Sequence, residues 1–109
     1  MNKEDIVKEN KRFQQIINNQ QFICNDAFTI YYIDSNVTKF GISVSKKMGN
    51  AVTRNKIKRQ IRNIVHKYKK LFPKDKEYII MIRRGYALKK FNEKEMKLLS
   101  LIRKMELNK

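Results

Sequence analysis

The stretch SVSKKMGNAVTRNKIKRQIR, residues 43–62, joins the end of a predicted strand to the start of a predicted helix. Apolar and small side chains alternate over residues 38–45, which predicts a strand. The Gly49–Asn50 pair then predicts a tight turn. Apolar residues next recur at helical spacing, and Pro73 disfavours helix at the residue before it, so the predicted helix spans residues 51–72. A strand, a turn and a long helix therefore form the centre of the predicted fold.

At about 100° per residue, the predicted helix divides into an apolar side and a polar side. The apolar side, expected to face the core, comprises Ile57, Ile61, Ile64, Val65, Tyr68, Leu71 and Phe72. The polar side comprises Asn55, Lys58, Arg59, Arg62 and His66. Arg54 has the phase of the apolar side, but at the helix start it can project past the edge of the core.

The charge around this helix has one sign, because no acid occurs between Asp34 and Asp75. A solvated helix face usually mixes signs to gain ion pairs between successive turns. Cations in the first turns are also unfavourable beside the positive end of the helix dipole. The N–H groups of a helix start, together with arginine side chains, are suited to phosphate. The segment therefore predicts a surface that binds an extended phosphate backbone.

Composition supports the same interpretation. The chain has 109 residues, which predicts one domain over residues 1–109, and 41% are hydrophobic, enough for a modest core. It carries 26 Lys and Arg against 10 Asp and Glu, a formal charge of +16. Such an excess predicts nucleic acid as the partner. An anionic membrane surface is the alternative, weakened because no segment is both strongly basic and apolar enough to lie in an interface.

The remaining elements are predicted from periodicity and end signals. They are helices at residues 2–19 and 92–107, strands at 22–24, 27–33 and 77–82, and a loop at 83–91. The strand at 77–82 is a continuous apolar run, which indicates a central position in the sheet. The order α-β-β-β-α-β-α predicts a single-domain α+β sandwich.

Each of these elements has a predicted buried face. In the strand at 27–33, Phe28, Ile30 and Tyr32 lie opposite Thr29, Tyr31 and Ile33. The first helix, with Asn2 as N-cap, is expected to place Ile6, Phe13, Ile16 and Ile17 on one face. The last helix is expected to have Asn92 as N-cap, Glu95 at N3 and an apolar face of Met96, Leu99, Ile102 and Met105 or Glu106.

The chain lacks the patterns of an independent catalyst. His66 and Cys24 are the only residues of their types, so no zinc-ligand spacing occurs and no internal disulfide can form. The carboxylates that could hold a metal for phosphodiester cleavage lie at predicted turns or strand starts: Asp26, Asp34, Asp75 and Glu77. No apolar signal-peptide core and no run of 18 apolar residues occurs. A cytoplasmic nucleic-acid binder is predicted, without a nuclease site of its own.

At SVSKKMGNAVTRNKIKRQIR the chain resembles the bacterial ribonuclease P protein subunit, whose signature is a Gly-Asn-Ala-Val turn followed by a basic Arg-Asn-Arg helix. The resemblance continues through NKRFQQI, FTIYYI and EYIIMIRRG, residues 10–16, 28–33 and 77–85. It implies a protein cofactor for a catalytic RNA that removes the 5′ leader from precursor tRNA, with Mg²⁺ held mainly by the RNA. The implied fold is the ribosomal protein S5 domain 2-like sandwich, with a left-handed β-α-β crossover.

The resemblance also implies two binding surfaces. A leader-binding cleft between the first helix and the sheet would contain Phe13, Ile17, Thr29, Tyr31, Ser43 and Arg54. Contacts to the RNA subunit would come from Arg54, Asn55, Lys56, Lys58, Arg59 and Arg62, together with Lys46 and Lys47. Lys56 stands where the family usually has arginine, which keeps the charge but loses bidentate geometry. Ile17 stands where a second aromatic residue is common.

Two other classes of function fit part of this pattern. A ribosomal or RNA-chaperone protein could use the same basic helix purely for binding, and it would co-purify with ribosomes. An autonomous nuclease is disfavoured by the missing acid, base and metal ligands. No protein partner is evident from the sequence. A ribonuclease P subunit is expected to co-purify with a single RNA of several hundred nucleotides.

Overall fold

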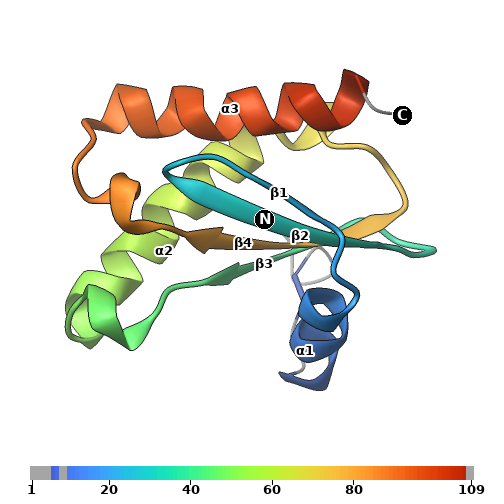
Figure 1. Ribbon diagram of the computed structural model, residues 1–109, viewed down its shortest axis with the longest axis horizontal. Coiled ribbons are helices and arrows are strands. Elements are labelled where there is room, and N and C mark those ends of the chain that lie inside the picture. The colour runs from blue at the N-terminus through green and yellow to red at the C-terminus, as the bar shows by residue number, and fades with distance from the viewer. Residues whose placement is uncertain (1–5, 8–9, 108–109) are drawn as a thin grey trace.

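A computed structural model of the chain describes residues 6–7 and 10–107, which form one sheet and three α-helices (Figure 1). The α-helices are α1 (Asn10–Asn18), α2 (Ala51–Lys67) and α3 (Phe91–Leu107). The strands are β1 (Phe22–Cys24), β2 (Phe28–Asp34), β3 (Lys39–Ser43) and β4 (Lys76–Ile82). Short 3₁₀ turns occur at η2 (Lys46–Met48), η3 (Lys69–Leu71) and η4 (Arg84–Tyr86).

The sheet is mixed, with the strand order β1-β2-β4-β3. β1 pairs antiparallel with β2, β2 pairs antiparallel with β4, and β3 pairs parallel with β4. The parallel pair needs a crossover connection, which α2 supplies. β4 lies between two strands, so the central position predicted from its apolar run is confirmed. The predicted α+β class, element order and strand positions are confirmed within the described residues.

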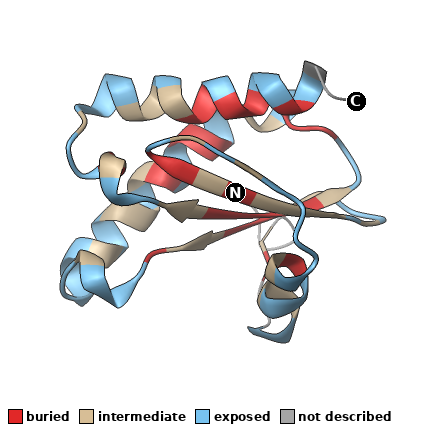
Figure 2. Cartoon of the chain, in the orientation of Figure 1, coloured by how far each residue is buried: buried red, intermediate tan, exposed pale blue. Residues whose placement is uncertain are grey.

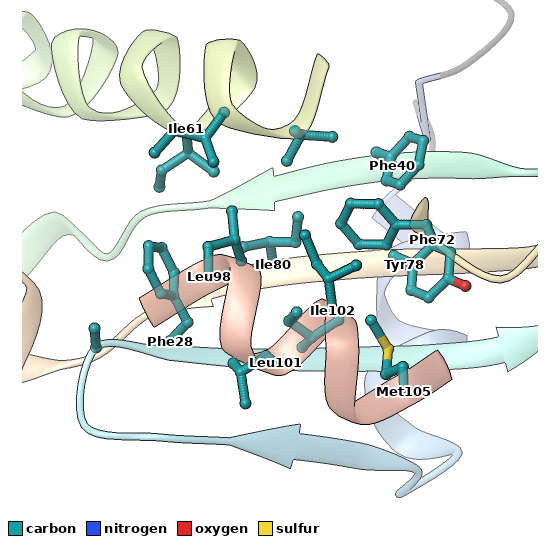
Figure 3. Packing of buried hydrophobic residues seen from close by; sticks show 14 of the residues in the cluster. Phe28, Phe40, Ile61, Phe72, Tyr78, Ile80, Leu98, Leu101, Ile102 and Met105 are labelled. Atoms are coloured by element: carbon teal, nitrogen blue, oxygen red, sulfur yellow. The ribbon is translucent and has the colours of Figure 1, made fainter. Parts of the chain in front are cut away.

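One face of the sheet packs against α2 and α3, and most of the buried residues lie between these layers (Figures 2 and 3). The aromatic part of this core is compact. The Tyr78 and Phe40 rings stack with centroids 5.5 Å apart, and Phe72 meets each of them edge-on. The Tyr78 hydroxyl donates to the Pro73 carbonyl at 2.6 Å, and burial raises its pKa. We call this face of the sheet the core face, because the larger cluster of buried residues packs on it.

The opposite face packs against α1, which lies on the other side of the sheet from α2 and α3 (Figure 1). Ile16 of α1 is buried against Ile79, while Phe13 and Tyr31 remain partly exposed. We call this the α1 face. The predicted division of β2 between two faces is confirmed, because Phe28 and Ile30 belong to the core face and Tyr31 to the α1 face.

The start of the first helix was predicted wrongly. Ile6 forms a parallel bridge with Phe40, and the Val7 N–H donates to the Phe40 carbonyl at 3.0 Å. The edge of β3 thus offers hydrogen bonds that hold this segment extended, and α1 begins only at Asn10. Residues 2–5, including the predicted cap Asn2, lie outside the described residues.

The end of the second helix was also predicted wrongly. α2 ends at Lys67, Tyr68 caps it, and the chain winds more tightly through η3. The change in winding rotates Leu71 out to an exposed fraction of 37%, whereas Phe72 stays buried. The rest of the predicted apolar side faces the core, since Ile61, Ile64 and Val65 are buried and Ile57 packs against them.

The last helix begins at Phe91, one residue before the predicted cap Asn92. Of its predicted apolar face, Leu99, Ile102 and Met105 are buried as expected, whereas Met96 is exposed. Leu98 and Leu101 are buried as well and pack into the core. Glu95 does not cap this helix. Its carboxylate accepts hydrogen bonds from Lys67 Nζ and the Tyr68 hydroxyl, so it ties α3 to the end of α2. The loop predicted at 83–91 contains η4, which buries Tyr86.

Candidate nucleic-acid interface

The turn before α2 is built as its sequence predicts. Gly49 has φ +136°, a conformation that other residues rarely adopt. Asn50 caps α2, and its side-chain oxygen accepts from the Thr53 N–H at 2.9 Å. The Ser45 hydroxyl oxygen likewise accepts from the Lys47 N–H and caps η2. These caps hold Lys46 and Lys47 immediately before the start of the basic helix.

The predicted cations gather on an open surface, which we call the basic surface. Its exposed members are Lys46, Lys47, Asn55, Lys56, Arg59 and Arg62, and its partly buried members are Arg54 and Lys58. Ion pairs between described side chains use the cations Arg12, Lys67, Lys76, Lys89 and Lys97. None of these belongs to the basic surface, so its charge is not offset by the acids that the structure describes.

Arg54 differs from its neighbours in one respect. Its Nε atom is buried and has no hydrogen-bond partner within the described part of the chain. A buried donor without a partner is costly, and a charged donor more so. Arg54 is thus a place on the basic surface where an anion would satisfy a donor that the described side chains leave unpaired.

Strand pairing arranges the α1 face in rows that cross the sheet. One row runs Phe22, Tyr31, Ile79, Gly41 from β1 to β3. The next row runs Cys24, Thr29, Met81, Ser43. The predicted cleft residues Thr29 and Ser43 therefore both neighbour Met81, which sequence reasoning missed. The alternation of β4 about Ile79 was the signal that could have identified it.

Phe13 lies against Gly41, the β3 residue at the end of the first row. A Cβ atom added to Gly41 would lie 2.6 Å from Phe13 Cζ and 2.7 Å from Ile79 Cδ1. The phenyl ring therefore occupies the room that the small residues of β3 leave. Ile17, also on α1, is partly buried, and so are Thr29, Tyr31 and Ser43. The predicted cleft residues are thus accessible in part.

The two predicted sites meet at one cavity of about 140 Å³. Phe13 and Gly41 line it from the α1 face, and Lys58 and Arg62 line it from α2, together with Ile6, Val7, Phe40 and Ile42. In the sequence analysis the two sets of residues shared only Arg54. The structure brings an aromatic ring and two cations to the same opening.

Near this site, one ion pair fastens α1 to the sheet. Arg12 pairs with Glu77, which is buried, and Arg12 Nε donates to Glu77 Oε2 at 3.1 Å. The hydrogen bond from Arg12 holds the pKa of the Glu77 carboxyl below its usual value.

No cluster of three His, Cys, Asp or Glu side chains able to hold a metal ion occurs among residues 6–7 and 10–107. No helix within these residues is long and apolar enough to cross a membrane.

A single α+β domain, whose basic surface forms no ion pair with the described acids and lies beside a partly open, aromatic sheet face, defines a class of small cationic proteins arranged for a polyanionic partner. The family model for Ribonuclease P matches residues 1–106. The chain therefore belongs to the ribonuclease P protein family.

Relatives of known identity agree with this assignment. The chain is 45% identical over 101 residues to the ribonuclease P protein component of Mesoplasma florum, covering 88% of this chain and 92% of the relative. It is 39% identical over 109 residues to that of Mycoplasma mycoides, covering 97% of this chain and all of the relative.

Solved structures agree as well. The RNase P protein of Staphylococcus aureus superposes with a TM-score of 0.83 at 32% identity, covering 93% of this chain and 94% of that one. The RNase P protein from Thermotoga maritima superposes with a TM-score of 0.82 at 25% identity, covering 91% and 96%.

Proposed function

We propose that the chain binds the catalytic RNA of ribonuclease P through the basic surface and the 5′ leader of precursor tRNA through the α1 face. Family membership makes the chain a protein component of ribonuclease P, which processes the 5′ ends of tRNA. In this proposal the RNA subunit carries out the endonucleolytic hydrolysis and holds the Mg²⁺ ions. The protein contributes binding and orientation of the two RNAs.

The observation that carries the proposal is the shared cavity, which Phe13 lines together with Lys58 and Arg62. Single-stranded RNA is bound by cations that follow the phosphates and aromatic rings that stack on the bases. Stacking on Phe13 and Tyr31 is tolerant of sequence, since every base has a flat face. Arg54 supports the same arrangement, because its buried Nε would donate to a phosphate.

The proposal extends to the fold type and the location. The parallel β3–β4 pair joined by α2 supports the ribosomal protein S5 domain 2-like sandwich, in which this crossover is left-handed against the usual rule. We place the chain in the cytoplasm, where precursor tRNA is made in bacteria. The hand of the crossover is tested by an experimental structure, and the location by imaging of a tagged chain.

The test of the binding roles uses a holoenzyme reconstituted with Tyr31→Ala. Loss of one stacked base should weaken binding of precursor tRNA roughly 10- to 100-fold. Affinity for mature tRNA should not change, because mature tRNA has no leader. The matched control is Tyr32→Ala, whose side chain lies on the core face of the same strand and should not discriminate between the two tRNAs. Equal losses for precursor and mature tRNA with Tyr31→Ala would exclude the α1 face as the leader site.

A further inference from the structure

The edge of the sheet carries an aromatic side chain that the proposed leader site does not use. Phe22 lies on β1, the last strand of the sheet, and its exposed fraction is 50%. Its ring centroid is 5.4 Å from that of Tyr31, and the two rings are tilted by 45°. A half-exposed phenyl ring in contact with a proposed base-binding residue calls for a physical reason.

Strand pairing shows which way this side chain points. Phe22 is directly opposite Tyr31, and residues opposite each other on paired strands share a face. Tyr31 packs against the α1 face, so Phe22 extends that face outward to the edge of the sheet. The aromatic residues of this face then form a line from Phe13 above Gly41, through Tyr31, to Phe22.

The backbone at Phe22 is also turned outward. The Tyr32 N–H donates to the Gln21 carbonyl and the Asn25 N–H to the Phe28 carbonyl, both at 3.0 Å. By the alternation of antiparallel pairing, the Phe22–Tyr31 pair between them exchanges no hydrogen bonds. The N–H and C=O of Phe22 therefore point away from β2, toward the open edge of the sheet. A ligand stacked on the phenyl ring would find a donor and an acceptor beside it.

We propose that Phe22, together with Tyr31, binds a further unpaired base of the leader at the β1 edge of the sheet. This inference rests on the proposed function and extends the leader path across the whole α1 face. Strands lie about 4.8 Å apart, so the path from β3 to β1 covers roughly 14 Å. Leaders long enough to reach β1 can stack on Phe22 and shorter leaders cannot, which makes Phe22 a determinant of leader-length preference.

A second protein strand is the competing occupant of an open sheet edge. β1 has only three residues, so a partner strand would form few backbone hydrogen bonds there. The charge of +16 opposes the approach of a second copy of the chain and favours the approach of RNA. Single-stranded RNA is therefore the occupant that these features favour.

The test measures the affinity of reconstituted holoenzymes for mature tRNA and for precursors with leaders of increasing length. Phe22→Ala should weaken binding of long-leader precursors about 5- to 10-fold and leave mature tRNA unaffected. The loss should appear only beyond a threshold leader length, and that threshold should be greater than the one for Tyr31→Ala. Phe22→Tyr should retain wild-type affinity, and Phe22→Leu should behave as Phe22→Ala because it lacks a flat aromatic face.

The matched control is Phe91→Ala at the start of α3, where the phenyl ring is 51% exposed but lies outside the α1 face. It should leave all affinities unchanged. Thermal unfolding of each variant separates loss of binding from loss of folding. Benzoylphenylalanine at position 22 should crosslink to the leader on irradiation, and a crosslink to a second copy of the chain instead would overturn the inference.

Three patterns of affinity would also overturn the inference, each in a different way. Equal losses for every leader length and for mature tRNA would make Phe22 a structural residue. Wild-type affinity in Phe22→Leu would show that apolar cover, not stacking, is what matters. Wild-type affinity in Phe22→Ala, with Tyr31→Ala still selective for precursor, would remove Phe22 from the site and leave the proposed function standing. If Tyr31→Ala also failed to discriminate, the proposed function itself would fall.

Discussion

The core face and the α1 face of the sheet differ in how completely they are covered. On the core face, α2 and α3 bury Phe28, Ile30 and Ile80 completely. On the α1 face, the single short helix α1 buries Ile79 but leaves Tyr31 and Met81 partly exposed. Side chains of one strand thus take part in both a close-packed interior and an accessible surface. Close packing is therefore found mainly on the core face, and the α1 face keeps side chains that solvent can reach.

The difference originates in the side chains that β2 and β3 direct to each face. Phe40 packs against Phe72 and Tyr78 on the core face, whereas Gly41 and Ser43 leave room on the other side. Phe13 occupies part of that room and Arg12 fastens its helix through Glu77. Truncation on the core face should therefore lower stability, and changes on the α1 face or the basic surface should mainly alter RNA binding.

The largest effect is expected for Ile61→Ala, because the side chain of Ile61 on α2 is completely buried in the core. The cavity left behind should lower the free energy of unfolding by about 2–5 kcal/mol. Chemical denaturation provides the measurement. Val52→Ala is the control on the same helix, since Val52 is 78% exposed, and it should change stability by less than about 0.5 kcal/mol. A similar small change for Ile61→Ala would contradict the division between the faces.

A smaller effect is expected for Gly41→Ala on the α1 face. The added methyl group would overlap Phe13 Cζ and Ile79 Cδ1, and overpacking of this kind costs about 1–3 kcal/mol. Displacement of Phe13 should also weaken precursor binding more than mature tRNA binding. The double variant Gly41→Ala/Phe13→Ala should be less destabilised than the sum of the two single variants, because the overlap with Phe13 is removed and only that with Ile79 remains. Simple additivity would show that Phe13 does not lie on Gly41.

The next effect concerns affinity and leaves stability unchanged. Arg59→Gln and Arg62→Gln remove exposed cations from the basic surface, so each should change the free energy of unfolding by less than about 0.5 kcal/mol. For each phosphate that is no longer neutralised, the slope of log affinity for the RNA subunit against log salt should become shallower by roughly 0.7–0.9. Filter binding across a salt series measures this slope. Arg103→Gln on α3 is the control, and an equal change there would argue against a localised basic surface.

The smallest effect is confined to acid pH. The Arg12 hydrogen bond lowers the pKa of Glu77 in the folded chain, so ionised Glu77 stabilises the fold above the usual carboxyl pKa of about 4.3. That contribution is lost as pH falls from there through the lower folded pKa. Glu77→Gln should therefore show a flatter dependence of unfolding free energy on pH in this window.

Most local features could be predicted from sequence. The two-residue period of the apolar pattern identified the faces of β2, the apolar run identified β4 as central, and the Gly49–Asn50 turn placed the start of α2 near Ala51. The errors share a cause. Ile6 left its predicted helix because β3 offered backbone hydrogen bonds, and Leu71 turned outward because η3 changed the winding. Both depend on contacts or geometry beyond a single periodic segment.

The sequence by itself determined the class of fold and the polar, cationic side of α2, since both depend on local periodicity and on charge that is present in any conformation. Only the tertiary structure decided which side chains act together. Phe13, Lys58 and Arg62 line one cavity at the edge of β3, and Phe22 contacts Tyr31 because the register of β1 on β2 places the two residues opposite each other. Register and layer order depend on packing between residues distant in the chain, which periodicity along one segment does not encode.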